Sequence, residues 1–169
     1  MIVGVDGSPG SLEALRCALG QARRLGAALI AVHAWRLPGG EVASRRSPVP
    51  GYARMVRDLE EQRLAQAFEE GLGGVPADVA VEPWLVRGAA GPALVEAADR
   101  VNDLLVVGAG RRGRLRHPLG AGTARYCLAH AVCPVVAVPP PSLQAEIPTQ
   151  LRLRTGANRL AHELTRTHR

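Results

Sequence analysis

Short apolar runs alternate with segments of helical periodicity along the first 140 residues of this 169-residue chain. Nearly continuous apolar runs are typical of parallel strands that are covered on both faces. Between them, Leu and Ala recur at three- and four-residue spacing, which predicts helices. Strands that alternate with helices favour a parallel sheet with helices on both faces, because each right-handed crossover places a helix over one face. The predicted fold is α/β, a single doubly wound domain with strands at 2–5, 28–34, 79–86, 104–107 and 134–138.

The predicted core is aliphatic, because hydrophobic residues make up 47% of the chain and aromatic residues only 3%. Helices are expected from the turn at 6–11 to Gly26, at 52–72, from Gly91-Pro92 onward, and at 123–131. The side chains expected to face inward are Leu12, Leu15, Ala18, Leu19, Ala22, Leu25, Met55, Leu59, Phe68, Leu72, Leu94, Val95 and Ala98.

Two segments lack this periodicity. Residues 35–51 contain three prolines and are expected to form an irregular loop over one end of the sheet. Beyond the three prolines at 139–141 the strand pattern is lost, and arginines outnumber acidic residues. The expected organisation is a domain at 1–140 followed by a basic, poorly ordered tail at 141–169.

A loop rich in glycine and arginine follows the strand at 104–107 and leads into the helix that begins at a Gly-Thr step. Glycine lets the backbone approach a ligand closely, because it has no Cβ. Helix N-termini and cationic side chains both favour anions. The loop therefore predicts a polyphosphate site, with an adenine nucleotide as the working hypothesis; its glycines are Gly108, Gly110, Gly113, Gly120 and Gly122, and its arginines are Arg111, Arg112, Arg114 and Arg116.

Composition argues against several other function classes. All 21 basic residues are arginine, so the lysine of a P-loop or of a Schiff-base enzyme is missing. Nucleic-acid binding is not favoured, because the few aromatic residues are not interleaved with the arginines. No run is long enough to span a membrane, and we expect no signal peptide, because the first residues have neither a charged segment nor a long apolar one. Three cysteines without a C-x-x-C pair favour the reducing cytoplasm.

Three segments together resemble the universal stress protein family over nearly all of residues 1–140: IVGVDGSPGS at 2–11, LIAVHAW at 29–35, and LLVVGAG through AHAVCPVVAV at 104–138. The resemblance implies a five-stranded parallel sheet of order 3-2-1-4-5, a homodimer through the strand at 134–138, and ATP bound with Mg²⁺ at the topological switch point. Asp6 could hold the Mg²⁺. The nucleotide-binding residues that it implies are Asp6, Gly7, Ser8, His33, Ala34, Val107, Gly108, Gly110, Arg111, Gly113, Gly122, Thr123 and Ala124.

The phosphate motif departs from the family pattern of Gly-x2-Gly-x9-Gly followed by Ser or Thr. Counting from Gly108 places Arg111 and Ala121 where glycines belong. Counting from Gly110 recovers later glycines and Thr123, but with one residue too few between them. Two interpretations therefore remain open: a nucleotide-binding regulatory module of the stress response, and a dimeric interaction protein of the same fold that binds no nucleotide.

Structural interpretations compete at individual residues. Asp6 could simply cap the first helix, the arginine cluster could be a solvated loop, and His33 is expected to be a hydrogen-bonded structural histidine rather than a metal ligand. Cys127 and Cys133 are expected to fill apolar space. No catalytic residue is predicted, since no Gly-x-Ser-x-Gly elbow is present. An adenylating enzyme is a further alternative, and any ATP hydrolysis is expected to be slow and incidental.

Overall fold

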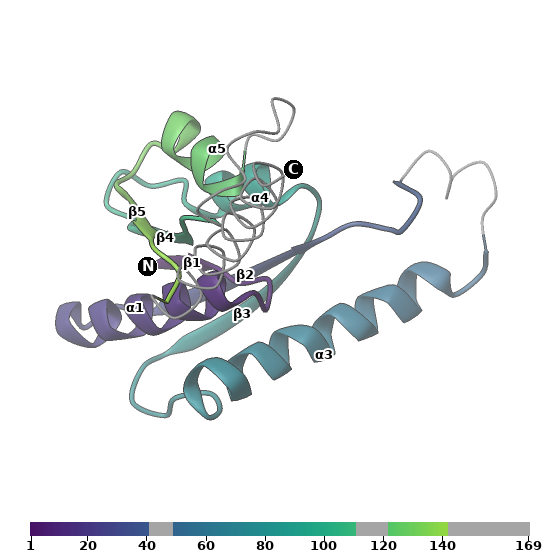
Figure 1. The fold of residues 1–169 in the computed structure, drawn as a ribbon, viewed down its shortest axis with the longest axis horizontal. Coiled ribbons are helices and arrows are strands. Elements are labelled where there is room, and N and C mark those ends of the chain that lie inside the picture. The colour runs from purple at the N-terminus through teal and green to yellow at the C-terminus, as the bar shows by residue number, and fades with distance from the viewer. Residues whose placement is uncertain (41–48, 111–121, 142–169) are drawn as a thin grey trace, which may run out of the picture.

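The computed structural model describes residues 1–40, 49–110 and 122–141 (Figure 1). The predicted tail beyond residue 141, and parts of both predicted loops, lie outside these residues. Five strands form one parallel sheet of order β3-β2-β1-β4-β5, which confirms the predicted topology. In chain order the elements are β1 (Ile2–Gly4), α1 (Pro9–Leu25), β2 (Leu29–Trp35), α3 (Tyr52–Leu72), β3 (Val81–Arg87), α4 (Ala90–Ala97), β4 (Leu105–Gly108), α5 (Thr123–His130) and β5 (Val135–Val138).

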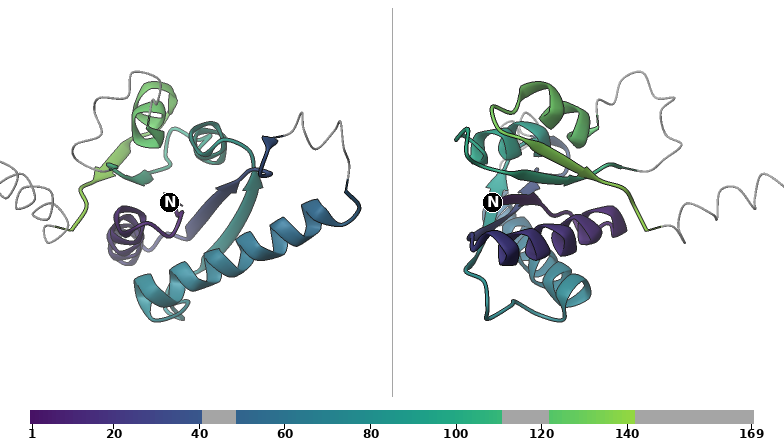
Figure 2. Two further views of the ribbon diagram at one scale, coloured as in Figure 1. Left: turned by 45° about the vertical axis from the view of Figure 1, so that its right-hand side comes forward. Right: turned by 90° about the vertical axis from the view of Figure 1, so that its left-hand side faces the viewer.

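Helices cover both faces of the sheet, with α1 and α3 on one side and α4 and α5 on the other (Figure 2). The central strands supply side chains to both layers, because successive residues of a strand point to opposite faces. Val3 and Val106 pack in the core beneath α1 and α3. Their neighbours Ile2 and Leu105 pack in the core beneath α4 and α5. This is why the strand sequences are apolar without a polar alternation.

The helix ends follow local sequence signals. Ser8 is the N-cap of α1, and its Oγ accepts a hydrogen bond from the Ser11 N–H at 3.3 Å. Gly26 ends α1 in the left-handed conformation, with φ of 60°. Pro92 is the third residue of α4 rather than its first, which a proline tolerates because first-turn N–H groups have no partner within the helix.

Three of the side chains expected in the core are exposed. Met55 and Leu59 of α3 are 62% and 48% exposed, because the helix is rotated so that Val56, Leu64 and Phe68 face inward. Leu25 is 65% exposed. It points in the same direction as Ala18 and Ala22, so its exposure reflects the position of the helix end and not its rotation. No helix in the described part of the chain is long and apolar enough to cross a bilayer.

Candidate functional site

The carboxyl ends of β1 and β4 meet at the topological switch point of the sheet. These two strands are neighbours, but α1 leaves β1 toward one face and α4 reaches β4 from the other. Open α/β sheets bind ligands in the crevice outside such a point. Two segments border it, the turn from Asp6 to Ser11 and the chain from Gly108 to Gly110.

Gly108 lies directly against the first turn of α1. A Cβ on Gly108 would stand 2.8 Å from the carbonyl oxygen of Gly10 and 3.3 Å from the backbone nitrogen of Ser11. Real Cβ atoms do not approach a backbone oxygen so closely, and a glycine is therefore required at this position. The structure thus brings together the two segments that the sequence placed at the site, and it also provides a packing reason for the glycine.

Hydrogen bonds among three residues hold the turn after β1. The Oδ1 atom of Asp6 accepts from the Ser8 N–H at 2.9 Å. The Asp6 N–H donates to Ser11 Oγ at 3.2 Å, and this hydroxyl donates to the Ser8 carbonyl at 2.9 Å. The cap of α1 is Ser8, so Asp6 shapes the turn and does not itself cap the helix.

The Asp6 carboxyl is exposed at the crevice and held in its ionised form. Partial burial raises the pKa of this group, but hydrogen bonds with Ser8 and Ser11 and the nearby His33 outweigh that effect, so its pKa lies below the ordinary value of 3.8. An ionised carboxylate at the switch point can accept hydrogen bonds from a ligand or coordinate a hard cation.

The side chain of His33 is buried and turned toward α3. Its Nδ1 lies 2.8 Å from the Val5 carbonyl oxygen, and its Nε2 lies 2.9 Å from Oε2 of Glu60. The expectation of a hydrogen-bonded structural histidine is confirmed. In the described residues, no group of three or more His, Cys, Asp or Glu side chains could hold a metal ion. Only the backbone of His33 is left to face a ligand.

Glu60 is a member of this site that the sequence did not reveal. Its carboxyl accepts from His33 and, at 2.6 Å, from Nη1 of Arg63. Partial burial raises the pKa of Glu60. The hydrogen bonds and charges of His33 and Arg63 lower it by a larger amount, so the pKa of this carboxyl lies below its ordinary value of 4.5. No local motif marks Glu60, because its partner lies 27 residues away in the sequence.

The end of β2 contributes two further residues near the crevice. Ala34 is half-buried, and Trp35 packs in a small core with Leu37 and Val56. The guanidinium of Arg87, at the end of the neighbouring β3, stands 5.6 Å from the centroid of the Trp35 ring. This spacing is typical of a cation–π contact. This contact links the ends of β2 and β3, which are neighbours in the sheet.

The other predicted site residues differ in what they offer. Gly7 and Gly110 adopt left-handed φ values of 77° and 75° with open space beside their Cα atoms, so backbone is accessible at both. The side chain of Val107 is buried in the core, and Ala124 packs against that core. Gly122 is the N-cap of α5, and Thr123, its first residue, is exposed. Arg111 and Gly113 lie outside the described residues.

Two of the three cysteines, Cys127 and Cys133, lie in environments that disfavour the thiolate. Cys127 and Cys133 are buried, and burial raises the pKa of both thiols. Thiols with raised pKa values are poor nucleophiles at neutral pH. This agrees with the expectation that they fill apolar space.

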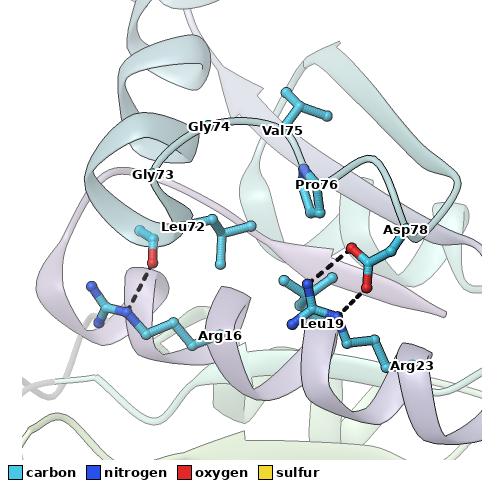
Figure 3. A pocket seen from close by; sticks show the side chains of 10 residues that line it. Arg16, Leu19, Arg23, Leu72, Gly73, Gly74, Val75, Pro76 and Asp78 are labelled. Atoms are coloured by element: carbon cyan, nitrogen blue, oxygen red, sulfur yellow. Dashed lines mark hydrogen bonds and ion pairs between the residues drawn. The ribbon is translucent and has the colours of Figure 1, made fainter.

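A hollow of about 400 Å³ lies away from the switch point, between α1 and the end of α3 (Figure 3). Its two arginines already have partners. The Nε of Arg16 donates to the Gly71 carbonyl at 2.9 Å, and Arg23 forms a bidentate ion pair with Asp78 at 2.6 and 2.9 Å. These contacts join α1 to the end of α3 and to the chain that enters β3, so we assign the hollow a structural role.

Comparison with known proteins gives a family and a fold. The family model for the universal stress protein family matches residues 1–139. Universal stress proteins of Mycobacterium tuberculosis and Mycobacterium bovis, named Rv1996 and Mb2019, are 35% identical over 113 residues, which are 67% of this chain. The chain spans about a third of their length, since those residues are 35% of each relative.

Solved structures agree with the sheet topology. A universal stress protein in complex with cAMP is 28% identical, with a TM-score of 0.52 over 81% of this chain and 93% of its own. A universal stress protein family protein from Arabidopsis thaliana with AMP bound is 19% identical, with a TM-score of 0.55 over 85% of this chain and 92% of its own. At that identity the second likeness shows the fold alone.

Proposed function

Because the chain belongs to the universal stress protein family, we propose that it is a regulatory module that binds an adenine nucleotide in the switch-point crevice. The observation that carries this proposal is the contact between Gly108 and the first turn of α1, which brings the end of β4 beside the turn that holds Asp6. The cAMP complex of a universal stress protein with the same fold supports an adenine nucleotide as the ligand class.

The proposed ligand contacts use backbone more than side chains. Gly7 and Gly110 lie on either side of the crevice, and among the described residues no atom lies within 4 Å of the place of a Cβ at either position. Backbone N–H groups at such positions can approach phosphate oxygens. The N-terminus of α5, which begins at Thr123, adds N–H groups without partners inside the helix.

ATP carried with Mg²⁺ is the specific form that we propose. Asp6 fits the cation, because Mg²⁺ prefers carboxylate oxygens and the low pKa of this group keeps it ionised. We propose a binding module and not an enzyme: turnover would need a base directed at the γ-phosphate, and the turn hydrogen bonds of Asp6 leave it poorly suited to that role. Any hydrolysis would then be slow and incidental.

The free thiols of the chain suit a reducing compartment, and we propose the cytoplasm as the location of the protein.

Isothermal titration tests the nucleotide proposal. The protein is titrated with Mg-ATP, AMP and cAMP, beside Asp6→Ala and beside Asp99→Ala, which removes an exposed carboxylate at the far end of α4. We expect one-to-one binding by the wild type and by Asp99→Ala, and at least tenfold weaker binding by Asp6→Ala, since a hydrogen bond to a charged group contributes about 1.5–3 kcal/mol. Absence of heat with every nucleotide at millimolar concentration, from folded protein, would contradict the proposal.

A second candidate is a dimeric interaction protein that binds no nucleotide. Its support is the edge strand β5, where Val136 is 38% exposed, and the exposed side chains of Leu128 and Val132 close to it in the chain. An exposed apolar edge strand favours pairing with another strand. We propose a homodimer through residues 134–138 in either case, since β5 is an edge of the sheet in the part of the chain that the structure describes, on the far side of β4 from β1.

A further inference from the structure

The sheet ends in β3 on one side and in β5 on the other, in the part of the chain that the structure describes (Figure 1). An edge strand bonds to one neighbour only, so part of its backbone N–H and C=O groups point away from the sheet. Such a row of groups is a template on which a further strand can pair. The hydrogen bonds at the two ends of each ladder decide which groups these are.

On β3, the even-numbered residues direct their backbone groups toward β2. The Leu29 N–H donates to the Ala80 carbonyl at 2.9 Å, and the Gly88 N–H donates to the Trp35 carbonyl at 2.8 Å. The pairing of the two strands continues without a break between these bonds. Because alternate residues of a parallel strand bond to opposite sides, the odd-numbered residues of β3 point outward. The first three outward positions are Val81, Pro83 and Leu85.

Pro83 stands in the middle of these three outward positions. A proline has no N–H, so the outward row of donors is broken at the centre of the strand. A strand added here would direct a carbonyl at residue 83 and find no donor. The edge is otherwise accessible, since Glu82 and Pro83 are exposed and Trp84 is 39% exposed. A proline confined to an outward position of an edge strand is the arrangement that a sheet tolerates.

The other edge strand, β5, has no such interruption. The Leu105 N–H donates to the Pro134 carbonyl at 3.0 Å, and the Ala109 N–H donates to the Val138 carbonyl at 2.7 Å, so its even-numbered residues face β4. The outward positions of β5 are Val135 and Ala137, and both have an N–H. The two edges therefore differ in what their backbone offers to another strand.

We propose that Pro83 closes the β3 edge to strand addition, so that the sheet accepts a second copy of this chain at β5 only. Pairing of β5 with β5 uses the same edge of both copies and closes as a two-fold dimer. Such a dimer would still present one β3 edge at each end, and pairing at these edges would extend it into a larger assembly. The pairing at β5 is the homodimer proposed above, whereas the closed edge at β3 belongs to the single chain.

The substitution Pro83→Val tests this proposal, because it restores an outward N–H and introduces a residue that favours strands. Pro83 is exposed, so the variant is expected to fold. Ala80→Val is the matched control. It adds a valine side chain at an exposed position just before the same strand, where the backbone faces β2, and so adds no outward donor.

Sedimentation velocity of the full chain over a range of concentrations gives the first readout. Ala80→Val should sediment as the wild type does. Pro83→Val should form a species at least twice as heavy, in a fraction that rises with concentration. In a Val136→Asp background, designed to block pairing at β5, Pro83→Val should produce a dimer where Val136→Asp alone is a monomer.

Sedimentation of Pro83→Val as the wild type, in both backgrounds, would overturn the proposal, as would equal association of Ala80→Val. A wild type that is monomeric would rule out the homodimer but not the closed edge, which the comparison of Pro83→Val with Ala80→Val still decides.

Hydrogen exchange of individual amides shows which edge is paired. The Leu85 N–H points outward next to the substituted position in the outward row. In Pro83→Val its exchange should slow by about twofold to tenfold as the protein concentration is raised, the range expected for one added hydrogen bond. It should stay constant in Ala80→Val. Association of Pro83→Val without any slowing on β3 would overturn the proposal.

Discussion

Gly108 at the end of β4 and Gly10 in the first turn of α1 are in direct backbone contact. A Cβ at position 108 would lie 2.8 Å from the Gly10 carbonyl oxygen. The contact seats α1 on the sheet next to β4, and it brings the Asp6 turn to the crevice. A glycine that could be read as a phosphate-loop residue is thus also required for packing.

The first prediction is that Gly108→Ala destabilises the protein by about 1–3 kcal/mol, since backbone must move to admit the methyl group. Urea unfolding measures the change. Gly20→Ala, in the middle of α1 with open space around it, is the control and should stabilise the fold by about 0.5–1 kcal/mol. Equal effects of the two substitutions would contradict the close contact.

The second prediction concerns the packing of α4 on α5. A Cβ on Gly91 would lie 2.6 Å from Cδ1 of Tyr126 and 2.9 Å from its Cβ, so α5 must shift to accept Gly91→Ala. We expect a loss of about 1–3 kcal/mol. In a Tyr126→Ala background the loss should be smaller by about 0.5–2 kcal/mol, because the ring is gone and only the Cβ of residue 126, at 2.9 Å, still obstructs the methyl group. A double-mutant cycle by thermal unfolding measures this coupling, and additive effects would argue against it.

The third prediction concerns the Arg16 contacts beside the hollow of Figure 3. The side chain donates to the Gly71 carbonyl at 2.9 Å and to the Glu70 carbonyl at 3.3 Å, at the end of α3. Arg16→Ala should cost about 0.5–1.5 kcal/mol in unfolding free energy, the usual net contribution of such bonds. Arg24→Ala, at an exposed position near the end of α1, should change it by less than about 0.5 kcal/mol.

The fourth prediction is a pH dependence of stability that comes from Glu60. Its pKa in the folded protein lies below the ordinary value of 4.5, so its ionised form stabilises the fold at neutral pH. That contribution is lost as the pH falls below 4.5 toward the folded-state pKa. Glu60→Gln should therefore be less stable than the wild type by about 1 kcal/mol at pH 7. The difference in unfolding free energy between the two proteins should become smaller as the pH falls below 4.5.

Urea unfolding between neutral and acidic pH measures this gap, with Glu61→Gln as the reference for a simple loss of one surface charge. A gap that stays constant down to the acid limit would mean that the carboxylate of Glu60 does not stabilise the fold through His33.

The fifth prediction tests association through β5. Val136→Asp places a charge on the exposed edge strand, and it should convert a dimer to a monomer in sedimentation velocity. Val75→Asp, at a 63% exposed position beside the hollow, should leave the oligomeric state unchanged. A wild type that sediments as a monomer at high concentration would rule out the homodimer.

The fold could be predicted from local and periodic features. The central strands are apolar on both faces because each contributes side chains to two cores. In β1, Ile2 packs in one core and Val3 packs in the other. Gly26 ends α1 as expected, because a left-handed residue at a helix end is a local requirement that a glycine meets. The order 3-2-1-4-5 came from the family resemblance, and with it came the meeting of Asp6 and Gly108 at the switch point.

Only the tertiary structure decided how the elements are rotated and which distant side chains meet. The periodicity of α3 fits more than one inward face, and packing selected the face of Val56 and left Met55 exposed. The partner of His33 could not be predicted, because a contact with Glu60 depends on the axial position of α3 against β2. The periodicity of apolar residues and the capping of helices depend on a few neighbouring residues, so the local sequence is enough to determine them. The rotation and axial position of a helix depend on the packing of the whole chain. This packing placed the carboxyl of Glu60 beside the buried ring of His33.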